Sequence, residues 1–143
     1  MFKKLDHVGV AVNNLEKAME VFHDVLGLSP TEMGIFSSKE MGVRGALLPI
    51  GNNSIELLEP IDPEGRIGQY MKAKGEGLFH LTIFADDFDA EIAKLEEKGY
   101  QMEKLEGELF PGFSLKAVFL SPEQTLGVPI EIVDVDSLPP GAA

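Results

Sequence analysis

The sequence predicts an α+β fold made of two βαβββ modules, and two observations support this prediction. The chain has 143 residues, and an alternating apolar run of strand type opens each half, at residues 5–12 and 78–85. In both halves a polar pair able to cap a helix follows the run, and a helical apolar pattern follows the pair. The same order of elements therefore occurs twice, as expected for a divergent internal repeat.

In the first half, residues 5–12 form the opening strand and Asn13-Asn14 cap the helix that follows. Apolar side chains then recur at helical spacing, at Leu15, Ala18, Met19, Phe22, Val25 and Leu26. Gly27 is a suitable residue to end this helix. Three further strands are expected near residues 32–37, 43–49 and 55–59, the last two separated by the turn "GNNS".

The second half repeats this order after a connector that contains a short helical pattern. Asp86-Asp87 are expected to cap a helix with its apolar stripe at Phe88, Ile92 and Leu95, and Gly99 to end it. Strands are expected at residues 100–105, 114–120 and 128–133. We thus expect one domain over 1–143, with modules at about 1–60 and 76–135, a connector at 61–75 and a frayed tail at 136–143.

Two histidines and two glutamates occupy matching strand positions of the repeat. His80 follows His7 by 73 residues (80 − 7), and Glu131 follows Glu56 by 75 (131 − 56). Taken singly, each is more often a surface or hydrogen-bonded residue. As a matched set, the four could converge if the halves pack side by side. Imidazole and carboxylate ligands together suit a divalent Co, Ni, Zn, Mn or Fe ion, with about two coordination positions left for water or substrate.

Composition excludes several classes of function. The chain has no cysteine, which rules out disulfides, thiolate metal sites and a cysteine nucleophile. A net charge of −12 without a basic cluster argues against nucleic acid and anionic membrane surfaces as partners. The sequence lacks an apolar run long enough to span a bilayer and a signal-peptide core, so a cytoplasmic location is expected.

The motifs "LDHVGVAV", "VFHDVLGL", "LLPIGNNSIELLEP", "KGEGLFHLTIF" and "GVPIEIV" resemble the vicinal oxygen chelate superfamily (glyoxalase/bleomycin resistance/dioxygenase), most of all methylmalonyl-CoA epimerase. The resemblance covers nearly the whole chain. It implies a cup-shaped mixed β-sheet with the helices outside, assembled as a homodimer. It also implies that His7, Glu56, His80 and Glu131 bind the metal ion.

The chemistry implied is epimerisation of a 2-substituted acyl thioester such as methylmalonyl-CoA. A metal ion stabilises the enolate that forms when a carboxylate takes the α-proton. Inversion needs two acid/base groups or one mobile group. Glu131 is the first candidate and Glu56 the second, with Glu40 and Glu108 as weaker ones in loops.

Several segments depart from the family pattern. Met41-Gly42-Val43 replaces Gln-Gly-Val, and Gly45 stands where some epimerases place a second acid/base glutamate. The loop "GELFPGFS" replaces a glycine-rich one, and its Phe110 and Phe113 could form a lid or simply pack on the domain. Ser121-Pro122 replaces His-Pro, and Glu123 a commonly basic residue. These changes favour an altered or smaller, more apolar substrate.

Three alternatives remain open at this point. A glyoxalase I-type lactoylglutathione lyase would use the same four ligands, whereas a non-catalytic ligand-binding member would not need them all. A ring-cleaving dioxygenase is disfavoured by the fourth ligand. The net charge disfavours an anionic CoA ester unless cations gather near the site, for which the candidates are Arg44, Arg66, Lys72, Lys74 and Lys116.

Overall fold

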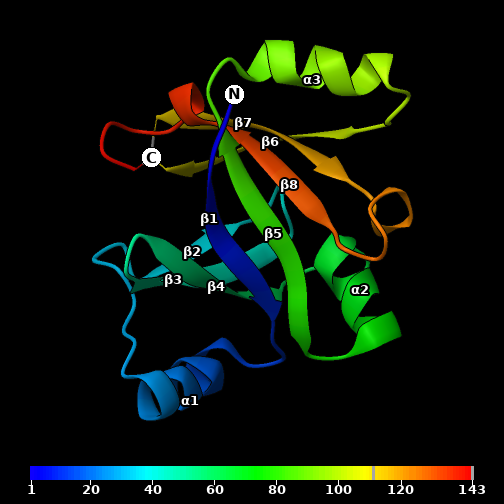
Figure 1. The fold of residues 1–143 in the computed structure, drawn as a ribbon. Coiled ribbons are helices and arrows are strands. Elements are labelled where there is room, and N and C mark those ends of the chain that lie inside the picture. The colour runs from blue at the N-terminus through cyan, green and yellow to red at the C-terminus, as the bar shows by residue number, and fades with distance from the viewer. Residues whose placement is uncertain (111, 143) are drawn as a thin grey trace. The chain divides into compact units, whose positions relative to one another are not determined.

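The computed structural model describes residues 1–110 and 112–142 and contains the predicted repeat (Figure 1). The first module consists of β1 (Phe2–Ala11), α1 (Leu15–Leu26), β2 (Ile35–Ser38), β3 (Val43–Ile50) and β4 (Asn53–Pro60). Helix α2 (Arg66–Lys74) lies in the connector. The second module consists of β5 (Gly77–Ala85), α3 (Phe88–Glu97), β6 (Glu103–Phe110), β7 (Phe113–Leu120) and β8 (Ile130–Asp134), with short 3₁₀ helices at Pro122–Gln124 and Val135–Ser137. The predicted α+β class with two βαβββ modules is confirmed.

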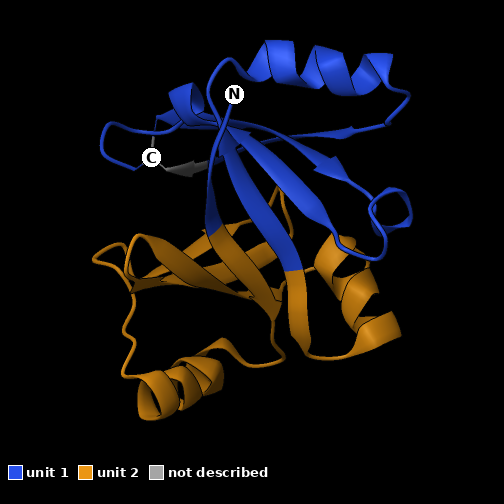
Figure 2. Cartoon of the chain, in the orientation of Figure 1, with its two compact units in different colours: residues 1–6, 80–143 blue, residues 7–79 orange. Residues whose placement is uncertain are grey.

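The chain forms two compact units, which differ slightly from the two modules (Figure 2). Unit 2 comprises residues 7–79, and unit 1 comprises residues 1–6 and 80–143. Strands β1 and β5 each contribute residues to both units, because the boundaries fall just before His7 and just before His80.

In unit 2 the strands are ordered β2-β3-β4-β1. The β2–β3 and β3–β4 pairs are antiparallel, whereas β4 and β1 are parallel. Helix α1 covers one face of this sheet. The core there consists of Val12, Leu15, Ala46, Leu48 and Leu57, with Val10, Ala18, Met19, Phe22, Leu28 and Ile55 packed around it.

Helix α1 begins and ends where the sequence predicts. The Asn14 side chain accepts a hydrogen bond from Lys17 N (2.9 Å), which satisfies one of the free amides of the first turn. At the other end Gly27 adopts a left-handed conformation (φ 71°), and its N–H donates to the His23 carbonyl. Local sequence is therefore sufficient to define both ends of this helix.

In unit 1 the strands are ordered β5-β8-β7-β6, with β5 and β8 parallel and the other pairs antiparallel. Helix α3 covers one face, over Ala85, Phe88, Val118, Leu120 and Ile132. A second cluster of buried side chains gathers Phe84, Leu115, Ala117 and Val133 with Leu105, Val135 and Leu138 around them. Both faces of this sheet thus carry packed apolar side chains.

The start of α3 differs from the prediction. Asp87 occupies the cap position, but its side chain makes no capping hydrogen bond. Its backbone is left-handed (φ 48°), whereas a capping side chain normally requires extended backbone at that residue. Of the helices in the described part of the chain, none is long and apolar enough to cross a membrane.

Candidate functional site

In unit 2, His7 and Glu56 lie on the sheet face opposite α1. His7 pairs with Ser54 and Gly9 with Glu56 in the parallel β1–β4 register, so alternation places the two side chains on the same side of the sheet. His7 Nε2 is 3.4 Å from Glu56 Oε1, and both residues are buried, with 8% and 9% exposure. We call this surface the His7 face; it also carries Phe36, Leu47 and Leu58.

In unit 1, His80 and Glu131 lie on one face of the β5–β8 pair. Thr82 pairs with Glu131, two residues beyond His80, so the three side chains share this surface, which we call the His80 face. His80 is 6% exposed. The fully buried Thr82 donates a hydrogen bond from Oγ1 to Glu131 Oε1 (3.1 Å), which holds that carboxylate against β5.

The two faces repeat one geometric relation. In each, the glutamate pairs with the residue two positions after the histidine: Gly9 in unit 2 and Thr82 in unit 1. The structure thus places the four candidate ligands as two pairs, each pair on one sheet face of one unit. A neutral imidazole beside a carboxylate is a donor set that suits a borderline divalent cation.

No side chain can be accommodated at position 45 without a shift in its surroundings. A Cβ on Gly45 would lie 2.5 Å from the Leu57 carbonyl oxygen and 2.7 Å from the ring of Phe36. Phe36 pairs directly with Gly45 across β2 and β3, and its ring occupies the space above the glycine. The position where the resemblance places a second acid/base glutamate is therefore a glycine covered by a buried aromatic ring on the His7 face.

The weaker acid/base candidates lie elsewhere. Glu40 lies in the turn between β2 and β3. Glu108 lies on β6 rather than in a loop, and its Oε1 accepts from Gly112 N (2.8 Å). The predicted loop "GELFPGFS" is wrong for most of its residues, since Phe110 ends β6 and Phe113 begins β7. Phe113 is 38% exposed, whereas the side chain of Phe110 and the following Pro111 lie outside the described residues.

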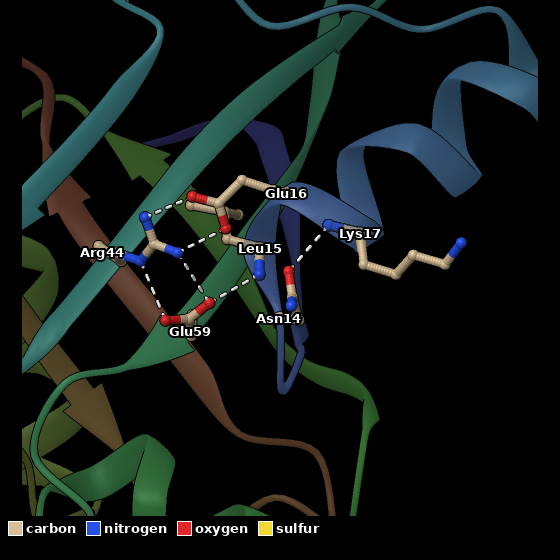
Figure 3. A network of polar contacts seen from close by, with 6 residues as sticks. All are labelled: Asn14, Leu15, Glu16, Lys17, Arg44 and Glu59. Carbon is tan, nitrogen blue, oxygen red and sulfur yellow. Dashed lines mark hydrogen bonds and ion pairs between the residues drawn. The ribbon is translucent and has the colours of Figure 1, made fainter.

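Arg44 joins β3, β4 and α1 on the helix-covered side of unit 2 (Figure 3). Its guanidinium donates two hydrogen bonds to Glu16 (2.8 and 2.6 Å) and two to Glu59 (2.9 and 3.1 Å). Glu59 also accepts from Leu15 N (2.7 Å), an otherwise free amide of the first turn of α1. Arg44 holds the pKa of both carboxyl groups below their ordinary values, and these carboxylates raise the pKa of Arg44.

The cations that could have attracted an anionic substrate are largely engaged in ion pairs. Besides Arg44, Lys72 contacts Glu64 and Lys116 contacts Asp89 (2.7 Å). The Asp89 contact raises the pKa of Lys116, and Lys72 lowers the pKa of Glu64. Three of the five candidate cations are therefore paired within their own unit.

Two residues of these faces, Thr82 and Phe36, were not predicted from the sequence. Thr82 lies two positions after His80 and matches Gly9 of the first module, so comparing the modules position by position would have found it. Phe36 gave no such signal, because its relation to Gly45 depends on the β2–β3 register.

Comparison with known proteins identifies the family of the chain. The model of the Glyoxalase/Bleomycin resistance protein/Dioxygenase superfamily matches residues 6–112. The mitochondrial methylmalonyl-CoA epimerase of Mus musculus is 35% identical over 131 residues, which are 90% of this chain and 71% of the mouse protein.

Solved structures give the same result for the fold. A methylmalonyl-CoA epimerase in complex with methylmalonyl-CoA and NH4+ has a TM-score of 0.81 at 27% identity, over 94% of this chain and 95% of that one. The epimerase from Mycobacterium tuberculosis has a TM-score of 0.79 at 30% identity, over 91% and 86%. The predicted family is confirmed: the chain belongs to the Glyoxalase/Bleomycin resistance protein/Dioxygenase superfamily and is an epimerase-like enzyme of it.

Proposed function

We propose that this protein is a metal-dependent epimerase of a 2-substituted acyl thioester of the methylmalonyl-CoA class. The observation that carries the proposal is the repeated pairing of a buried histidine with a glutamate on the His7 and His80 faces. Relatives whose names state this activity support the choice of substrate class.

The donor set fits a divalent ion. We infer that His7, Glu56, His80 and Glu131 are its ligands; the first three are buried residues of types that could hold a metal ion. A buried carboxylate is costly unless a cation or hydrogen-bond donors compensate its charge. Two imidazoles and two carboxylates would provide four ligands and leave room for substrate oxygens.

The bound ion would supply Lewis-acid stabilisation of the negative charge that develops on the thioester carbonyl oxygen. The chain's own residues would move the proton. Glu131 takes the α-proton while the C–H electron pair passes into the carbonyl group, which gives an enolate. Thr82 orients the Glu131 carboxylate for this transfer through its hydrogen bond.

Inversion requires that a proton return to the opposite side of the α-carbon. Position 45 cannot supply it, since a glycine under the Phe36 ring has no acid group. Glu56 is then the second acid/base group. It is the repeat equivalent of Glu131 in the first module.

The test is proton exchange at the α-carbon of methylmalonyl-CoA in D2O, followed by ¹H NMR. Protein loaded with Co²⁺ is expected to exchange the α-proton for deuterium and to interconvert the two epimers. Treatment with a chelator should abolish the exchange, and added Co²⁺ should restore it. Absence of exchange by folded, metal-loaded protein would refute the proposal.

Variants assign the roles within the site. Glu131→Gln is expected to lower the exchange rate at least about 100-fold, since general acid–base groups contribute ~10²–10⁴. Glu106→Gln, an exposed carboxylate on β6, is the matched control and should leave the rate unchanged. Turnover of methylglyoxal with a thiol in place of exchange would instead assign a lactoylglutathione lyase.

We also propose that the protein is a homodimer located in the cytoplasm. The homodimer follows from the resemblance to the superfamily and the location from the composition. Light scattering on the purified protein tests the assembly, and a monomer at micromolar concentration would refute it.

A further inference from the structure

We propose that Phe36, packed over Gly45, is the specificity-determining residue of the site and limits the size of the apolar substituent on the α-carbon of the substrate. This inference rests on the proposed function. It concerns the part of the His7 face that contains no metal ligand.

The register of unit 2 places Phe36 on the same face as the proposed ligands. Phe36 pairs with Gly45, and Gly45 pairs with Leu58. Two residues further along β3, Leu47 pairs with Glu56. Cross-strand partners project to the same side, so the Phe36 ring, Leu58 and Leu47 form an apolar surface adjoining the Glu56 carboxylate.

The glycine gives this surface its shape. Because position 45 has no side chain, the ring reaches to 2.7 Å from where a Cβ would lie, and Leu58 Cδ2 reaches to 3.1 Å. The ring is 9% exposed and therefore closely packed. This surface is apolar and closely packed, which suits an alkyl substituent rather than a charged group.

This apolar surface would limit the size of the substituent on the α-carbon. One methylene in a hydrophobic pocket changes specificity by ~10–200-fold. A relative from Cereibacter sphaeroides, 26% identical over 137 residues, is named for both ethylmalonyl-CoA and methylmalonyl-CoA. These two thioesters differ by one methylene, so they are suitable probes.

The experiment compares α-proton exchange rates for methylmalonyl-CoA and ethylmalonyl-CoA in the wild type, Phe36→Leu and Phe36→Ala. We expect the ratio of kcat/KM for the ethyl over the methyl substrate to rise about 10-fold in Phe36→Ala. The conservative Phe36→Leu should give a smaller rise in the same direction, and its near-native volume keeps the test valid if the alanine variant unfolds. Circular dichroism checks the fold of each variant.

Ile35→Ala is the matched control, since Ile35 is the neighbouring residue on the opposite face of β2 and pairs with Ala46. Its substrate ratio should equal that of the wild type. An unchanged ratio in folded Phe36 variants of a wild type that exchanges protons overturns this inference alone. A wild type that exchanges neither substrate overturns the proposed function, and this inference with it.

Discussion

Replacing Arg44 with alanine is expected to destabilise the protein without affecting substrate binding. Four hydrogen bonds join its guanidinium to Glu16 and Glu59. The Glu16 side chain is 54% exposed, so solvent screens that pair and its contribution to stability is small. The Glu59 side chain is only 20% exposed, and hydrogen bonds to such a charged group contribute about 1.5–3 kcal/mol.

Together these contributions give a loss of about 2–3 kcal/mol in the free energy of unfolding. For a chain of this length the corresponding fall in Tm is about 10 °C. Urea and thermal denaturation followed by circular dichroism measure both quantities. Arg44→Lys should recover less than half of the loss, because an ammonium group cannot form the paired bonds of the guanidinium fork.

The effect should depend on pH. Arg44 lowers the pKa of Glu16 and Glu59 from the ordinary value of 4.5. A carboxyl group with a depressed pKa in the folded state stabilises the protein fully above its unfolded pKa, and this stabilisation is lost as pH falls through the folded value. The difference between wild type and Arg44→Ala should therefore be complete at pH 7 and shrink in acid below about pH 4.5.

Lys17→Ala provides the control, since its pair with Glu20 spans 3.7 Å between side chains that are about 70% exposed. This change should alter stability by less than about 0.5 kcal/mol. Unfolding of Arg44→Ala at the same urea concentration as the wild type would contradict this prediction. A variant that keeps its stability but has a raised KM would also contradict it, since Arg44 would then contact substrate.

Three further predictions concern the sheet faces and the helix. Thr82→Val should lower kcat about 3–10-fold with little change in KM, because Glu131 loses the hydrogen bond that orients it; equal kinetics would remove Thr82 from the site. Gly45→Ala should cost about 1–3 kcal/mol, measured by urea unfolding, because its Cβ would approach the Leu57 carbonyl to 2.5 Å; wild-type stability would contradict that geometry. Asn14→Ala should cost about 1 kcal/mol in the same assay through the lost helix cap, whereas Asn14→Asp should cost little.

The order of elements could be predicted because it depends on local patterns. Alternation with period 2 identified the strands, and apolar residues at period 3.6 identified α1 between Asn14 and Gly27. Boundaries were less accurate where the pattern is weak: β6 starts at Glu103 rather than at residue 100. The capping prediction at Asp87 was wrong in detail, since a carboxylate in the right place does not fix its backbone angle.

The candidate ligands could also be predicted, because the repeat matched His7 with His80 and Glu56 with Glu131 within one sequence. Tertiary structure alone decided what surrounds them. The bond from Thr82 to Glu131, the Arg44 bridge and the ring of Phe36 over Gly45 all join residues from different elements. Such contacts depend on strand register and side-chain packing. Both are properties of the whole sheet, and they produce no periodic pattern in the sequence.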